Sequence, residues 1–128
     1  GVYIGTRFIA THECDAHPTV KQAVIEARDV ATVSVKKWTV VGRDLNNAFT
    51  QTFAEMQESG ASAEQLLRFL TEHTMYQGLV EGDTEQGEVP CGQNAAMIHA
   101  IVSAAEVVQS IMQGVPAVMS QVKDKTGC

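Results

Sequence analysis

The stretch from residue 1 to residue 10 constrains the fold more than any other part of the sequence. Residues 2–4 are predicted to form a short β-strand that runs directly into Gly5-Thr6 and a helical turn. A strand must pair its backbone groups with neighbouring strands, and the sequence provides none before this one. Either the protein starts abruptly at this strand, or the chain is the back part of a larger protein.

The junction after this strand has the features of an anion site. A glycine such as Gly5 can adopt the tight turn that brings backbone N–H groups close to a ligand. Thr6 adds a hydroxyl group, and a helix start presents free N–H groups at the positive end of the helix dipole. The junction suits a phosphate group, although a simple turn is the alternative for a glycine between a strand and a helix.

The composition is that of a soluble globular protein. The 128 residues are 45% hydrophobic and 19% charged, which argues against an intrinsically disordered chain. The net charge of −6 and the scattered basic residues argue against a nucleic-acid partner. The longest uncharged run, residues 89–105, contains Gln93, Asn94 and His99, so we expect a buried helix there and no membrane span.

The cysteines lie at wide and irregular spacing, at Cys14, Cys91 and Cys128. They form neither a zinc motif nor a disulfide framework, and the first residues do not resemble a secretion signal. We therefore predict reduced thiols, a cytoplasmic location and no bound metal. The loop that contains His12, Cys14 and His17 lacks the spacing of a known metal site and is interpreted as solvated.

Apolar residues at helical spacing, together with capping motifs, predict a mainly helical chain. Capping boxes should open helices at Thr19, Ser62 and Ser103. The helix after Ser103 should stop at Gly114, and a last helix should restart at Pro116. Further helical stretches are predicted over residues 48–58, 75–80 and 95–102, the last of them buried.

Two stretches depart from the helical pattern. Residues 29–41 are rich in β-branched side chains, which predicts one or two short strands with a turn at Lys36-Lys37 and a break at Gly42. Residues 81–90 are acidic and punctuated by glycines. They lack the order of an EF-hand and are either a functional loop near a ligand or a solvated connector.

A Gly-Gln-Asn sequence follows this acidic loop, at Gly92, Gln93 and Asn94. As a helix start it offers free N–H groups and two amide side chains to a polar ligand. Simple capping by the two amides is an equal alternative. His99, in the predicted helix that follows, is interpreted as a core or edge histidine without a catalytic partner.

Two blocks of the sequence carry a family resemblance. The first is Gly-Val-Tyr-Ile-Gly-Thr-Arg-Phe-Ile-Ala-Thr at residues 1–11, followed by Glu-Cys-Asp-Ala-His-Pro. The second is Glu-Gly-Asp-Thr-Glu-Gln-Gly-Glu-Val-Pro-Cys-Gly-Gln-Asn-Ala-Ala-Met-Ile at residues 81–98. In their order and separation, and in the Gly42-Arg43 segment between them, they resemble the nitronate monooxygenase family, once called 2-nitropropane dioxygenases. The flavin-type enoyl-ACP reductases belong to the same group.

The resemblance implies an α/β fold, the FMN-binding (β/α)₈ or TIM barrel. This chain would be a mostly helical C-terminal part of it, with the last barrel strand and a short β ribbon. Residues 1–18 would form the last barrel strand and the phosphate-loop segment, and residues 19–128 the mainly helical part. One compact unit over residues 1–128 is the alternative. Gly5 and Thr6 would lie on the FMN phosphate, and Gly92 and Gln93 would face the flavin or the substrate.

The resemblance is incomplete in two places. The family pattern Ala-Gly-Gln-x-Ala-Gly has Cys91 at its first position and Ala96 at its last. The family's catalytic histidine and most FMN-contacting strands come earlier in the chain, and none of the histidines here sits in a matching motif: His12, His17, His73 and His99. We therefore assign no catalytic residue and expect the isolated chain to be inactive, because the protein must hold and orient the flavin.

Three functional hypotheses follow. The first is the C-terminal portion of an FMN-dependent oxidoreductase that oxidises alkyl nitronates with O₂ or reduces an enoyl-ACP, with a small-molecule substrate as its partner and neither nucleic acid nor membrane. The alternative is a standalone helical interaction or oligomerisation module without catalysis, a homo-oligomer that covers Val2, Ile4 and residues 95–102 by self-association. The third makes Cys91 a nucleophile at a helix N-terminus.

Overall fold

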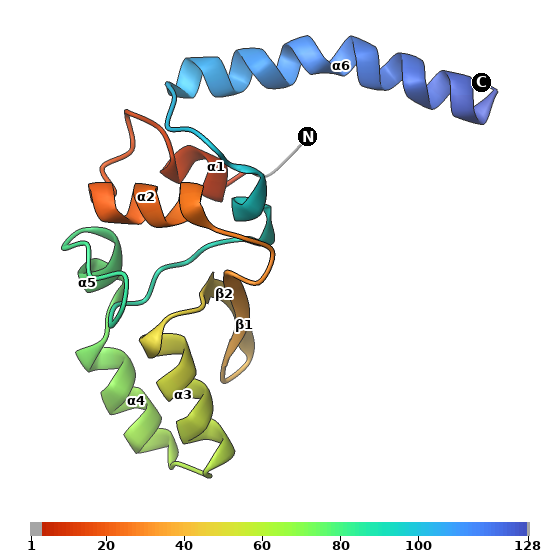
Figure 1. Cartoon of the computed structure of the whole chain (residues 1–128). Coiled ribbons are helices and arrows are strands. Elements are labelled where there is room, and N and C mark those ends of the chain that lie inside the picture. Colours follow the sequence, from red (N-terminus) through yellow and green to blue (C-terminus); the bar gives the residue numbers. More distant parts are fainter. Residues whose placement is uncertain (1–3, 128) are drawn as a thin grey trace.

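The structure, a computed structural model, describes residues 4–127. Within these residues the chain is mostly helical, with one two-stranded antiparallel sheet. The strand predicted over residues 2–4 lies outside the described residues except for Ile4, which is in no strand. The elements in chain order (Figure 1) are α1 (Thr6–Ile9), α2 (Pro18–Glu26), β1 (Thr32–Lys37), β2 (Val40–Leu45), α3 (Ala48–Glu58), α4 (Ala63–Glu72), α5 (Met75–Leu79), the 3₁₀ helix η1 (Gln93–Met97) and α6 (Ala104–Thr126).

The main core surrounds α2. Val20 and Val24 lie four residues apart on one face of this helix and are completely buried, as the spacing of its apolar residues predicts. Complete burial of each valine stabilises the fold by about 1.5–3 kcal/mol. Figure 1 shows α1 and η1 beside α2, and these elements share the core with it. The other buried members of the cluster are Ala10, Ala27, Leu45, Val89, Cys91, Ala95 and Ile98.

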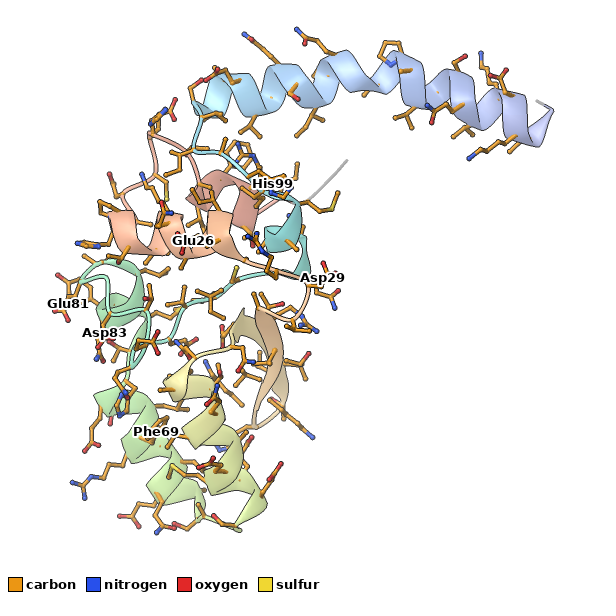
Figure 2. All side chains as sticks on the ribbon, viewed as in Figure 1. Glu26, Asp29, Phe69, Glu81, Asp83 and His99 are labelled. Atoms are coloured by element: carbon orange, nitrogen blue, oxygen red, sulfur yellow. The ribbon has the colours of Figure 1, made fainter. Side chains whose placement is uncertain are left out.

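A second cluster of aromatic rings joins α3 to α4. The ring of Phe69, which Figure 2 shows on α4, stacks on Phe49 and Phe53 of α3 at centroid distances of 5.6 and 6.1 Å. His73 is the C-cap of α4, and its ring lies 4.4 Å from that of Phe69. Its Nδ1 is 3.0 Å from the carbonyl oxygen of Gln86. The cluster therefore anchors the acidic loop as well as the two helices.

The turn of the β ribbon lies at residues 38–39, because Lys37 pairs with Val40. The turn predicted at Lys36-Lys37 is wrong. Lys37 stays in the strand because its side chain reaches the inner face of the ribbon, where two carboxylates pair with it. Trp38 makes the turn instead, with a positive φ of 54°, and its side chain is 53% exposed.

Gly42 lies inside β2, so the predicted break at this residue is also wrong. The strand continues because a third extended segment runs along its other edge. The Leu45 N–H donates to the Val89 carbonyl and the Cys91 N–H donates to the Arg43 carbonyl, each over 2.9 Å. Backbone pairing with a distant segment therefore overrides the tendency of glycine to interrupt a strand.

Capping side chains explain most helix starts. Ser62 and Ser103 form the predicted capping boxes of α4 and α6. At α2 the prediction is wrong, because the side chain of His17 is the N-cap and accepts the N–H of Thr19. The Thr19 hydroxyl donates instead to the carbonyl of Gly82 over 2.8 Å. This bond ties the start of α2 to the acidic loop.

The buried helix predicted over residues 95–102 is not formed. η1 (Gln93–Met97) is a 3₁₀ turn, and the chain then runs on without helical structure to Val102. Val102 makes a parallel bridge to the end of α1, where its carbonyl accepts the His12 N–H over 3.0 Å. His99, labelled in Figure 2, is exposed rather than part of the core.

α6 is one continuous helix of 23 residues, so the predicted stop at Gly114 and restart at Pro116 are wrong. Proline removes the N–H that would bond the Met112 carbonyl, but Met112 is exposed and water can reach that carbonyl. The helix ends at Gly127 with φ 67°. Figure 1 shows α6 extending away from the rest of the molecule. Neither α6 nor any other helix in the described part of the chain is long and apolar enough to cross a membrane.

Candidate functional site

A cavity of about 760 Å³ lies between the start of α1, the middle of β2 and the segment before η1. Its volume is within the range of about 300–1,000 Å³ that is usual for small-molecule sites. We call it the α1–β2 cavity. It is lined by Gly5, Thr6, Ile9, Val41, Gly42, Arg43, Pro90, Cys91, Gly92 and Asn94.

Gly5, Thr6 and Gly92, three of the predicted binding residues, line this cavity, whereas Gln93 is exposed and does not. The Gly92 N–H donates to the Thr6 hydroxyl oxygen over 2.9 Å. A Cβ atom on Gly92 would lie 3.0 Å from Oδ1 of Asn94 and 3.3 Å from Oγ1 of Thr6, so a side chain here would crowd the contact between the two segments. Gly5 begins a turn in which the Phe8 N–H donates to its carbonyl over 2.9 Å, but its φ of −105° is one that any residue adopts, so the turn does not require glycine.

Two polar residues of the cavity, Arg43 and Asn94, were not predicted as binding residues. The Arg43 guanidinium is held against β1, where Nη1 donates to the Thr32 carbonyl and Nη2 to the Ser34 hydroxyl, each over 3.0 Å. A fixed guanidinium and glycine backbone suit a phosphate group. The one sign in the sequence was the Gly42-Arg43 pair between the two family blocks.

Cys91 lines the cavity, but its side chain belongs to the apolar core and the residue is 2% exposed. Burial, with a smaller contribution from the negative charge of Asp44, raises the pKa of this thiol to about 11. The thiol is therefore protonated at neutral pH. The hypothesis that Cys91 is a nucleophile is wrong, because a reactive cysteine needs an accessible thiolate.

The cavity brings together the two sequence blocks that carry the family resemblance, and comparison with known families agrees. A family model described as nitronate monooxygenase matches residues 1–114. The chain belongs to the nitronate monooxygenase family. The matched residues include every residue that lines the α1–β2 cavity.

The chain also resembles solved structures of FabK. The chain is 27% identical to FabK from Thermotoga maritima, with a TM-score of 0.84, and the match covers 94% of this chain and 38% of that one. A methionine-to-alanine mutant of the Thermotoga maritima FabK matches with 26% identity, a TM-score of 0.75, and coverage of 94% and 36%. The chain thus spans well under half the length of these FabK structures.

The acidic loop of the second nitronate monooxygenase block is held by its own side chains. Asp83 accepts the Gln86 N–H over 2.9 Å and the amide of Gln77 over 2.8 Å. The hydrogen bond from the Gln86 backbone, with smaller contributions from other donors, holds the pKa of Asp83 below its usual value. Asn47 also donates to the carbonyls of Thr84 and Gly87. These bonds fix the path of the chain toward residues 88–92 and the cavity wall.

None of the histidines is among the residues that line the α1–β2 cavity. His17 caps α2 and His73 packs on the aromatic cluster, while His12 and His99 are exposed. Across residues 4–127, no group of three or more His, Cys, Asp and Glu side chains is placed to hold a metal ion.

Proposed function

We propose that this chain is the C-terminal portion of an FMN-dependent oxidoreductase of the nitronate monooxygenase type. The observation that carries the proposal is the convergence of Thr6, Arg43 and Gly92 on one cavity inside the family match. The reaction would be the oxidation of alkyl nitronates with O₂, with reduction of an enoyl-ACP as the alternative suggested by the likeness to FabK.

The residues of the α1–β2 cavity fit a flavin mononucleotide in volume and in chemistry. The guanidinium of Arg43, the amide of Asn94 and the hydroxyl of Thr6 are groups that bind phosphate and ribityl oxygens. Gly92 leaves its backbone open to close approach, because no Cβ stands in front of it. When bound, FMN supplies the electron transfer, and the part of the chain described here binds and orients it.

The remainder of the site would come from the part of the family fold that has no counterpart here. Residues 2–4 would be the last strand of an FMN-binding barrel, and residues 1–18 would carry the phosphate-binding segment. Ala10 belongs to the same core cluster as Val20 and Val24, which supports one compact unit. Cys14 and Cys91 are free thiols, which supports a reducing, cytoplasmic location.

The test compares FMN with riboflavin, which lacks the phosphate. We expect FMN to shift the backbone amide signals of Gly5, Thr6 and Gly92 in a saturable way, weakly in the isolated chain, and riboflavin to shift them far less. Gly92→Val should abolish the response, and Gly114→Val, on α6 with open space around it, should not. Equal shifts with both flavins, or shifts confined to residues outside the cavity, would contradict the proposal.

A separate measurement tests activity. We expect no oxidation of an alkyl nitronate by this chain with added FMN, because no residue here is assigned a catalytic role. Turnover above the rate with FMN alone would show that the site is complete within these residues.

A second function, self-association without catalysis, is favoured by one observation on α6. The surface expected to be exposed on residues 95–102 is partly closed, because Ala95 and Ile98 are buried. α6 instead presents an apolar stripe of seven side chains that are 40% to 63% exposed: Val108, Ile111, Met112, Val115, Val118, Met119 and Val122. Residues 108, 111, 115, 118 and 122 follow the alternating spacing of three and four that is typical of a helix–helix seam.

Sedimentation tests this second function directly. If a second copy covers the stripe, the wild-type chain is a dimer, and Val115→Lys converts it to a monomer. Gln113→Lys places the same charge on the same helix outside the stripe and should leave the dimer intact. A monomeric wild-type chain at high concentration would exclude self-association.

A further inference from the structure

Three charged side chains meet on one face of the β ribbon, two from the ribbon itself and one from the acidic loop, which is distant in the sequence. Lys37 at the end of β1 places its Nζ 2.5 Å from Oε1 of Glu88 and 3.8 Å from Oδ2 of Asp44 in β2. The side chains of Lys37, Asp44 and Glu88 are only 21%, 4% and 16% exposed. The ammonium also lies over the ring of Phe49, 5.5 Å from its centroid. We call these three residues the ribbon cluster.

The ribbon cluster has one cation for two carboxylates. Lys37 makes its short contact with Glu88, and Oδ2 of Asp44 is buried without a hydrogen-bond partner. A buried carboxylate oxygen without a hydrogen bond is costly, and burial together with the charge of Glu88 raises the pKa of Asp44 against the opposing effect of Lys37. The other titratable group that senses Asp44 is the thiol of Cys91.

The neighbouring cation does not relieve Asp44. The guanidinium of Arg43 donates to the Thr32 carbonyl and the Ser34 hydroxyl of β1. Adjacent residues of a strand point to opposite faces, so Arg43 and Asp44 lie on different faces of the ribbon. The negative charge of the buried Asp44 carboxylate can therefore be balanced only by Lys37 or removed by a proton.

The ribbon cluster lies at one end of the segment that forms a wall of the α1–β2 cavity. Glu88 begins this segment, which runs along β2 through the bonds of Val89 and Cys91 to the strand backbone, each 2.9 Å long. Asp44 itself bridges to Pro90. At the other end, the Gly92 N–H bonds to the Thr6 hydroxyl. A shift of the segment at Glu88 would therefore reach Gly92 and Thr6.

We propose that Asp44 is a positioning residue. When Asp44 is protonated, Lys37 pairs with Glu88 and residues 88–92 stay bound to β2. When Asp44 ionises, this wall of the cavity loosens. When Asp44 gives up its proton to solvent, a second buried negative charge competes with Glu88 for Lys37. The segment then gains freedom at the end that leads to Gly92. A role in regulating flavin binding rests on the proposed function, although the contacts of Asp44 themselves do not involve a flavin.

The experiment follows backbone amides by NMR as the pH is raised from acid to neutral, with no flavin present. In the wild-type chain we expect Cys91, Gly92 and Thr6 to shift together, with one midpoint above the ordinary range of an aspartate. Thr6 is the informative residue, because it touches the segment through Gly92. We also expect hydrogen exchange at the Gly92 N–H to accelerate by about tenfold beyond its intrinsic pH dependence.

Two variants and a control test whether the titration of Asp44 causes the common shift of these amides. Asp44→Asn should abolish the common midpoint. Glu88→Gln should move it to lower pH, because Lys37 then serves Asp44 alone. Glu72→Gln removes half of the exposed Arg68–Glu72 pair and should change nothing at the cavity.

The outcomes separate this inference from the flavin proposal. A common midpoint that persists in Asp44→Asn, or that rises in Glu88→Gln, overturns the role of Asp44 whether or not FMN binds. If Asp44→Asn does not fold, Glu88→Gln and the wild-type chain still decide the matter. Failure of FMN to shift the cavity amides would refute the proposed function and leave the midpoint of Thr6 unchanged.

Discussion

α2 and α6 have apolar residues at similar helical spacing but differ in what covers them. α2 is nine residues long and buries Val20 and Val24 completely. α6 is 23 residues long, and Val107 is its one buried residue among those described. Most helical stability in proteins comes from packing of an apolar face. α2 is therefore stabilised by the core, whereas α6 depends on its end caps and its own hydrogen bonds.

The largest contrast should come from removing methyl groups on each helix. Val24→Ala leaves a cavity in the core and should lower the free energy of unfolding by about 2–3 kcal/mol. Val118→Ala on the exposed stripe should change it by less than about 0.5 kcal/mol. Urea unfolding followed by circular dichroism measures both. A comparable loss in the two variants would show that the α6 stripe is covered in solution.

Glycine substitutions should have opposite signs in the two regions. A Cβ on Gly87 would collide with the backbone nitrogen of Gly78, so Gly87→Ala should cost about 1–3 kcal/mol. Gly114 is inside α6, where a Cβ would meet no atom within 4 Å, so Gly114→Ala should add about 0.5–1 kcal/mol to helix stability. Thermal unfolding of both variants tests this, and a stable Gly87→Ala would mean that the acidic loop can move.

Loss of a cap should affect α6 without affecting the core. Ser103→Ala removes the side chain that accepts the Glu106 N–H over 3.1 Å and should destabilise the start of α6 by about 1 kcal/mol. Hydrogen exchange should rise in the first turn of α6 and stay constant in α2. Ser120→Ala, in the middle of the same helix, is the matched control, and equal changes in both variants would contradict a capping role.

The smallest effect is a difference in pH dependence. Hydrogen bonds from the Ser103 side chain and backbone lower the pKa of Glu106, so its stabilisation of α6 is lost as the pH falls through that lowered pKa. Burial raises the pKa of Asp44, so its contribution is complete in acid and is lost as the pH rises through the raised pKa. Amide protection measured in acid and at neutral pH should change in opposite directions at Gly92 and at the start of α6.

Some features that depend on residues close in sequence were predicted correctly, although the capping box at Thr19 was not. The capping boxes at Ser62 and Ser103 need groups three residues apart, and the sequence displays both partners. Features that depend on distant partners were missed. Lys37 stays in its strand because its side chain pairs with Asp44 across the ribbon and with Glu88 of the acidic loop, and Val102 is extended because it pairs with the end of α1. Tertiary contacts overrode local preference in both places.

In the candidate site, too, some residues were indicated by the sequence and others were brought in by distant contacts. The family pattern pointed to Thr6 and Gly92, which lie 86 positions apart and meet through a hydrogen bond. Arg43 reaches the cavity because β2 pairs with residues 89–91, a contact that no local pattern displays. Gln93 is exposed and does not line the cavity, and it begins a 3₁₀ turn in place of the expected α-helix.

The tryptophan at the ribbon turn limits what one common assay can report. The chain has one tryptophan, and Trp38 is half exposed at the tip of a hairpin rather than packed in the α2 core. Its fluorescence will therefore be insensitive to collapse of that core, yet it follows Lys37 directly in the chain. Emission from this indole is a built-in optical probe of the ribbon and of the charged groups beneath it.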